Sequence, residues 1–124
     1  RAQKVANIAN EIPPTEIFGE SKGDVLILSW GSGHGASRAA TESLLSENIK
    51  VGHASIKWIS PLPSDLGTIL KNYKKVLIPE VNTGQFRQII RAEYLVDAIG
   101  LNEVQGKPLG ASKIVEKVKD LMDG

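Results

Sequence analysis

The sequence predicts an α/β domain of three layers, in which a short and mostly parallel sheet is covered by helices on both faces. Two observations predict this fold class. Short apolar segments bounded by turn residues alternate along the chain with helical patterns of roughly ten to fifteen residues, as βαβ units require. The clearest strand segment is also a nearly continuous apolar run, which is typical of strands buried on both faces of a parallel sheet.

The composition fits one globular domain and excludes several kinds of site. The chain has 124 residues, 41% hydrophobic and 23% charged, and its net charge of +1 gives nucleic-acid binding no electrostatic support. It contains no cysteine, which excludes disulfides, thiolate-bound zinc, iron–sulfur ligation and a cysteine nucleophile. Any redox cofactor must therefore be held elsewhere.

The apolar runs are far shorter than the ~20 residues that cross a bilayer. We therefore expect no membrane partner and a cytoplasmic location. The chain opens at Arg1 inside a helical pattern (Val5, Ile8, Ala9, Ile12), and Pro13 and Pro14 end this pattern. We expect a segment of a longer polypeptide, with a connector helix and loop over residues 1–20 and the α/β domain over residues 21–124. Residues 13–23 are predicted to form a surface loop.

The elements of the domain are predicted in order. Residues 24–30 form the first strand, and small residues at helical spacing from Ala36 to Leu44 predict the helix that follows. A second strand is expected between Lys50 and Trp58, with His53 and Trp58 in or beside the sheet. A helix is expected from the spacing of Leu66, Ile69, Leu70 and Tyr73.

The second half repeats the alternation. Residues 75–80 predict a third strand, and apolar spacing from Gln85 predicts a helix that ends near Gly100, since glycine can close a last helical turn. A last strand is expected over residues 101–105. An apolar face from Ile114 to Met122 predicts a closing helix that begins near Ser112.

Two loops follow strands at the edge where ligands bind in such folds. The first is a glycine loop, whose free backbone N–H groups at a helix start could hold an anion. It lacks the spacing of a dinucleotide or phosphate loop, so the competing explanation is that its glycines only permit a sharp turn and close helix packing. Its candidate residues are Gly31, Ser32, Gly33, His34 and Gly35.

The second loop joins an acid, amide side chains and a glycine at the start of a helix. Its candidate residues are Glu80, Asn82, Thr83, Gly84 and Gln85, with Arg87 and Arg91 forming a basic edge beside it. These polar groups could recognise a ligand or partner, or they could only cap the following helix, with the arginines solvated. The two explanations stay open from the sequence.

Catalytic and metal sites have little support. Ser32 and His34 could form the nucleophile and base of a small hydrolase, but no acid that would orient the histidine is identifiable. Two histidines nineteen positions apart do not form a metal-binding pattern. We therefore predict no catalytic and no metal-binding residue in this chain.

Four segments of the chain resemble the alpha subunit of 2-oxoacid:ferredoxin oxidoreductases, particularly the 2-oxoglutarate type. They are residues 28–32 with the glycine and Ala-rich helix that follow, residues 59–63, residues 79–86, and residues 94–97 leading to 104–108. The Glu-x-Asn-x-Gly-Gln stretch from Glu80, with Arg91 and Tyr94, is the most specific part. Where family members often have Ser-Thr after the first glycine of the first loop, this chain has Ser32, Gly33 and His34.

The resemblance implies a Rossmann-like fold similar to the C-terminal domain of transketolase. It also implies a parent enzyme that oxidatively decarboxylates a 2-oxoacid, passes electrons to ferredoxin and transfers the acyl group to coenzyme A. Thiamine diphosphate, magnesium and iron–sulfur clusters would be held by other domains or by the beta subunit. The expected partners are the rest of the alpha subunit, the beta subunit and ferredoxin, and this domain would support assembly and shape the cleft. The alternative function is a phosphate- or nucleotide-binding module that uses the loop from Gly31 to Gly35.

Overall fold

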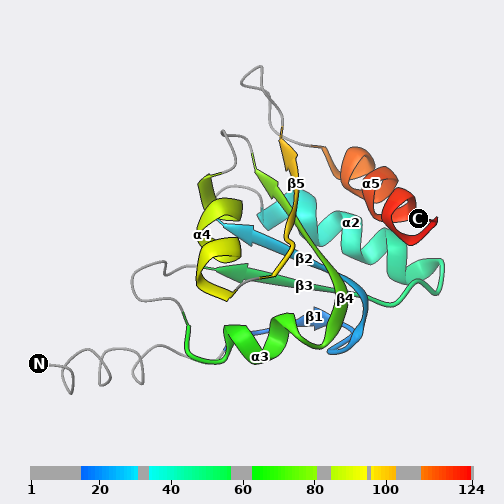
Figure 1. Cartoon of the computed structure of the whole chain (residues 1–124). Helices are drawn as coiled ribbons and strands as arrows, with labels where there is room; N and C mark the ends of the chain where they lie inside the picture. Colours follow the sequence, from blue (N-terminus) through cyan, green and yellow to red (C-terminus); the bar gives the residue numbers. More distant parts are fainter. Residues whose placement is uncertain are drawn as a thin grey trace, which may run out of the picture.

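The computed structural model describes residues 15–30, 34–56, 63–80, 85–94, 96–102 and 110–123. These residues form five strands and four helices around one sheet (Figure 1). The strands are β1 (Phe18–Gly19), β2 (Gly23–Trp30), β3 (Val51–Ile56), β4 (Tyr73–Glu80) and β5 (Ile99–Asn102). The helices are α2 (His34–Ser46), α3 (Leu66–Leu70), α4 (Gln85–Tyr94) and α5 (Ala111–Asp123).

The strand order is β1-β3-β2-β4-β5, with every pair parallel except β1 and β3. The central strand β2 aligns Ile27 with His53 of β3 and with Leu77 of β4. This arrangement confirms the predicted α/β fold class with a mostly parallel sheet. The antiparallel strand β1 lies within the stretch predicted to be a surface loop, so that prediction was wrong for residues 18–19. A strand of two residues is too short to show the alternation of apolar and polar side chains by which strands are predicted.

Alternate residues of the strands build two separate apolar cores. On one face, Leu26 and Leu28 pack with residues of α3 and α4, including Leu66 and Phe86. On the other face, Val25 and Ile27 pack with residues of α2 and α5, including Leu44, Ala40, Ile114 and Val118. The domain therefore has three layers, with α3 and α4 on one side of the sheet and α2 and α5 on the other (Figure 1).

The end of α2 follows from its sequence. Asn48 adopts a left-handed conformation with φ of 63°, which asparagine tolerates better than most residues. The Asn48 N–H donates to the Leu45 carbonyl and the Ile49 N–H to the Leu44 carbonyl, a Schellman motif that caps the helix. The chain then turns directly into β3.

Several boundaries differ from the prediction. The spacing of Tyr73 from Leu66 predicts a helical residue, but Tyr73 begins β4. The prediction was wrong because the same position also fits the start of a strand. Helix α4 ends at Tyr94, and Gly100 lies inside β5 instead of closing the helix. Strand β5 begins at Ile99, two residues before the predicted start. The predicted opening helix and Trp58 lie outside the described residues.

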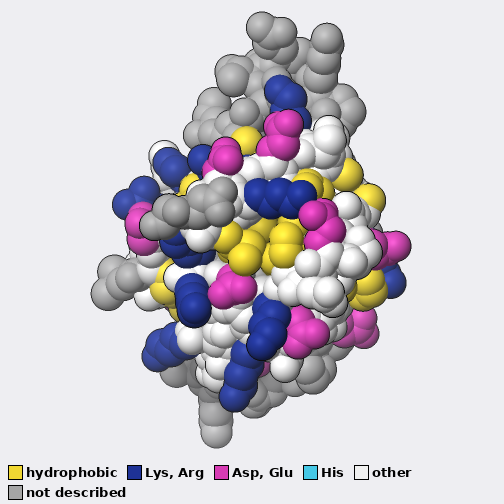
Figure 2. Space-filling model, turned by 90° about the vertical axis from the view of Figure 1, so that its right-hand side faces the viewer, with side chains coloured by type: hydrophobic (Ala, Val, Ile, Leu, Met, Phe, Trp, Pro, Cys, Tyr) yellow, Lys and Arg dark blue, Asp and Glu magenta, His cyan; other side chains and the backbone are white. Residues whose placement is uncertain are grey.

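The face over α2 and α5 carries charges of both signs. Figure 2 shows Lys and Arg side chains interspersed with Asp and Glu around a small group of hydrophobic side chains. Arg38 pairs with Glu42 within α2, and Lys119 of α5 pairs with Glu47. This face therefore offers no large patch of a single charge. Within the part of the chain that the structure describes, no helix is long and apolar enough to cross a membrane.

Candidate functional site at the carboxyl edge of the sheet

The two loops predicted to carry function leave the sheet from neighbouring strands. Strands β2 and β4 are paired in parallel, and they end at Trp30 and Glu80. The helices that follow them cover opposite faces, α2 on one and α4 on the other. This is a topological switch point, the position at which open α/β sheets form a crevice for ligands.

The structure describes some of the predicted site residues. His34 and Gly35 begin α2, and Gly35 has no described heavy atom within 4 Å of the position that a Cβ would occupy. Glu80 ends β4 and Gln85 begins α4. The remaining loop residues lie outside the described ranges: Gly31, Ser32, Gly33, Asn82, Thr83 and Gly84.

The two arginines of the predicted basic edge have different surroundings. Arg87 is half-buried, and its guanidinium and Cδ lie 3.0–3.3 Å from where a Cβ on Gly100 would be, so glycine makes room for this side chain. Arg91 lies one turn further along α4, and its Nη2 is 3.8 Å from Asp97 Oδ1. Both groups of this ion pair are exposed, so the pair contributes little to stability. Arg87 packs on β5, whereas Arg91 faces solvent.

An aromatic pair next to the loops was not singled out from the sequence. The ring of Trp30 stacks on Phe86 with centroids 6.0 Å apart and planes at 26°. Phe86 is buried, whereas Trp30 is 43% exposed. The pair ties the end of β2 to the first turn of α4. The signal that could have found it is the strand alternation of Leu26, Leu28 and Trp30, which predicts one shared face.

A buried polar pair lies on the opposite face of the sheet. Ser29 Oγ and His53 Nε2 are 2.9 Å apart, and the two residues are 0% and 2% exposed. The location of His53 in the sheet is thus as predicted. Thr41 of α2 is also buried and donates its hydroxyl to the Ser37 carbonyl at 2.7 Å. A substrate cannot reach the serine and histidine, so this pair is part of the packing and not a hydrolytic site.

Two tyrosines have raised pKa values, both on the face covered by α3 and α4. Burial, aided by the charge of Glu20, raises the pKa of Tyr73 to about 12. Burial also raises the pKa of Tyr94, with smaller effects from Glu93 and Asp65. Neither tyrosine lies at the end of β2 or β4. Among the described residues, no group of three His, Asp or Glu side chains could hold a metal ion.

The fold defines the class: an α/β domain with a five-stranded, mostly parallel sheet and transketolase-like structural neighbours. It superposes on a split-gene transketolase with a TM-score of 0.66 at 18% identity, covering 90% of this chain and 43% of that chain. The family model described as pyruvate:ferredoxin oxidoreductase core domain II matches residues 23–108. The chain therefore belongs to the core domain II family of 2-oxoacid:ferredoxin oxidoreductase alpha subunits, as its resemblance predicted.

Two similar proteins are of the 2-oxoglutarate type. The chain is 34% identical over 82% of its length to the 2-oxoglutarate oxidoreductase subunit KorA of Mycobacterium tuberculosis. It superposes with a TM-score of 0.88, at 33% identity over 94% of its length, on 2-oxoglutarate:ferredoxin oxidoreductase from Magnetococcus marinus, solved with 2-oxoglutarate, coenzyme A and succinyl-CoA bound. The chain spans 16% and 21% of the lengths of these two proteins.

Proposed function

We propose that this chain is a domain of the alpha subunit of a thiamine-diphosphate-dependent 2-oxoglutarate:ferredoxin oxidoreductase. The observation that carries the proposal is the superposition on the Magnetococcus marinus enzyme at 33% identity over 94% of this chain. The parent enzyme would convert a 2-oxoacid and coenzyme A to an acyl-CoA and carbon dioxide, with two electrons passing to ferredoxin and a proton released. A cytoplasmic location remains part of this proposal.

Within that enzyme, we assign the domain to assembly and to shaping the cleft. The Ser29–His53 pair of the described residues is buried and therefore belongs to the packing of the domain. The exposed ring of Trp30 lies at the switch point where β2 and β4 end, and the sequence places polar residues in the loops that follow. Such an edge suits contact with another domain, with the beta subunit or with the end of a bound substrate.

The metal centres of the parent enzyme find no matching ligand group among the described residues of this domain. Iron–sulfur clusters are held mainly by cysteine thiolates, and the chain has no cysteine. Magnesium prefers oxygen ligands, and no group of three His, Asp or Glu side chains comes together among the described residues. Thiamine diphosphate supplies a carbanion-stabilising ylid when bound. We place these groups in other domains or in the beta subunit.

The test uses the intact alpha subunit, expressed with its beta subunit. We expect reduction of ferredoxin that requires both 2-oxoglutarate and coenzyme A. In parallel, calorimetric titration of the 124-residue chain with thiamine diphosphate and magnesium should give no heat of binding. Tight binding of thiamine diphosphate to this chain would contradict the assignment of the cofactors to other domains. If the intact enzyme oxidised no 2-oxoacid, the proposed parent reaction would be wrong.

The alternative function is a phosphate- or nucleotide-binding module at the start of α2. The observation that favours it is Gly35, because no described heavy atom lies near its missing Cβ and close packing therefore does not explain the glycine. Backbone N–H groups at a helix start bind anions. Thermal shift with nucleotides and coenzyme A separates the functions, since a bound ligand raises the melting temperature. An unchanged melting temperature favours the assembly role.

A further inference from the structure

One carboxylate fastens the segment by which the chain enters the domain. Thr15 donates two hydrogen bonds to Asp65, one from its backbone N–H to Oδ2 and one from its hydroxyl to Oδ1, both of 2.8 Å. Hydrogen bonds to an ionised carboxylate are stronger than those between neutral groups. Asp65 is the N-cap residue of α3, yet its side chain makes no capping hydrogen bond. Its carboxylate holds Thr15 instead of the helix.

The contact lies at the edge of the sheet that carries the candidate site. Strand β1 is antiparallel to β3, with Phe18 opposite His53 and Gly19 opposite Gly52. The residues before Phe18 therefore continue toward the carboxyl end of β3. Asp65 lies between that end and α3 in the chain. Thr15 is thus held at the carboxyl edge, where β2 and β4 also end.

Further contacts fasten residues 15–20, which we call the strap. Ile17 packs against the core under α3 and α4, whereas the guanidinium of Arg38 from α2 lies 4.0 Å from the centroid of the Phe18 ring. The Glu20 N–H donates to the Val51 carbonyl at 2.9 Å, and the Tyr73 hydroxyl donates to the Glu20 carbonyl. The strap therefore contacts both helical layers and the sheet.

We propose that Asp65 is a latch that holds the strap and thereby sets where the polypeptide preceding Thr15 meets the domain. The strap is part of the folded domain. The latch holds Thr15 at the carboxyl edge of the sheet, on the side of β3. In the intact alpha subunit, the latch then orients the preceding part of the subunit relative to the candidate site. This consequence rests on the proposed function.

Amide hydrogen exchange of the 124-residue chain tests the latch. Thr15→Val keeps the shape of the side chain but removes the hydroxyl donor, and Asp65→Asn removes one acceptor oxygen and the charge. We expect either change to accelerate exchange in the strap about tenfold or more, with the amides of β2 and β4 unaffected, because local opening is governed by local contacts.

Two control variants complete this experiment. Thr15→Ser keeps both donors and should retain the protection of the strap. Glu47→Gln removes an exposed ion pair with Lys119 that does not involve the strap, and it should change nothing. Unchanged exchange in Thr15→Val and Asp65→Asn would overturn the latch, as would equal acceleration throughout the domain.

The orienting role needs a second measurement in the intact alpha subunit with its beta subunit. We expect Asp65→Asn to lower kcat for the 2-oxoacid several-fold, with Glu47→Gln as the control. A normal kcat together with a loosened strap would overturn the orienting role and leave the latch standing. A wild-type enzyme without 2-oxoacid oxidation would contradict the proposed function, while the exchange result on the isolated chain would remain valid.

Discussion

At the scale of single residues, the contact between Tyr73 of β4 and the strap depends on the absence of a side chain at position 52 of β3. A Cβ on Gly52 would lie 2.3 Å from the Tyr73 hydroxyl oxygen and 2.5 Å from the Glu20 carbonyl oxygen. Both distances are shorter than any van der Waals contact. Gly52 therefore allows Tyr73 to reach across β3 to the strap, where its hydroxyl donates to Glu20.

Gly52→Ala should destabilise the domain by about 2–4 kcal/mol, because the methyl group has no space and would break the Tyr73 hydrogen bond. Urea denaturation measures the change. Gly35→Ala is the matched control, since no described atom lies near its Cβ position and alanine favours helix, so it should be neutral or stabilising. Equal urea midpoints for the two variants would contradict this prediction, because they would show that the domain accommodates a methyl group at Gly52 with little loss of stability.

The raised pKa of Tyr73 predicts a loss of stability in alkali. In the unfolded chain the phenol ionises near its usual pKa of 10.0, whereas in the folded domain its pKa is about 12. The contribution is fully present below pH 10 and is lost as the pH rises toward 12, since the unfolded state releases its proton first. We expect a decline of about 1–2 kcal/mol across this window.

Urea midpoints measured from pH 9 upward check this expectation. Tyr73→Phe is the reference, because it removes the ionisable group but keeps the ring, and its stability should vary less with pH than that of the wild type. All other ionisable groups, Tyr94 included, are common to both proteins, so their contributions cancel in the difference. Parallel curves for the two proteins would refute the assignment to Tyr73.

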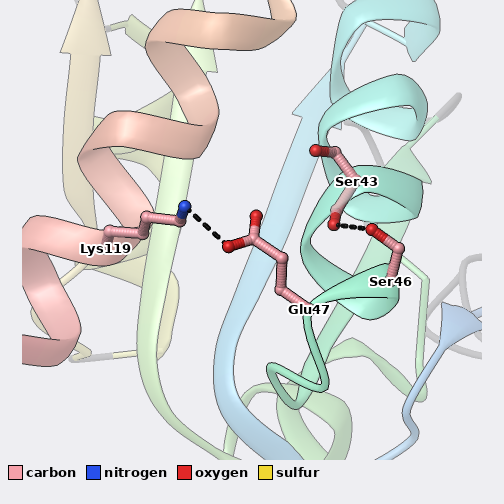
Figure 3. A network of polar contacts seen from close by, with 4 residues as sticks. All are labelled: Ser43, Ser46, Glu47 and Lys119. Carbon is pink, nitrogen blue, oxygen red and sulfur yellow. Dashed lines mark hydrogen bonds and ion pairs between the residues drawn. The ribbon is translucent and has the colours of Figure 1, made fainter.

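At the scale of elements, α5 is held by its apolar face more than by its charges. Ile114 and Val118 are fully buried against β2, β4 and α2. The ion pair from Lys119 to Glu47, 2.9 Å long, joins α5 to the end of α2 next to the Ser46–Ser43 hydrogen bond (Figure 3). Its two side chains are about half exposed, and water and salt screen such pairs.

Ile114→Ala should cost about 2–5 kcal/mol, the usual range for a large aliphatic residue that leaves a cavity. Lys119→Ala should cost at most about 1 kcal/mol, as exposed ion pairs do. Thermal denaturation of both variants, repeated at high salt, compares the two contributions. A loss for Lys119→Ala as large as that for Ile114→Ala would reverse this ranking.

The elements also show why strand and helix boundaries were harder to predict than the elements themselves. Tyr73 stands seven residues after Leu66, a helical spacing, yet α3 ends at Leu70 and Tyr73 pairs with Gly23 of β2. Gly100 fits a helix end by residue type, but β5 needs a glycine there because Arg87 packs over it. In both cases a contact distant in sequence decides between two local patterns.

At the scale of the whole molecule, the proposed assembly role predicts a difference between the two edges of the sheet. Substituting Asn82 and Gln85 by alanine in the intact alpha subunit should weaken association with its partners, measured by size-exclusion chromatography. The melting temperature of the 124-residue chain should change little. Asn72→Ala is the control, because Asn72 is exposed and precedes β4 at the opposite edge. Undisturbed assembly of the double variant would count against the role.

The sequence by itself determined the fold class, the main strands and helices and the family. Apolar periodicity is a local property that reports on burial, and the glycine and amide segments around residues 31 and 84 identify the family. Only the tertiary structure decided which side chains meet: Trp30 with Phe86, Ser29 with His53, and Thr15 with Asp65. The physical reason is that strand order and register bring these residues together, and no local pattern in the chain encodes partners that lie 24 or 50 positions apart.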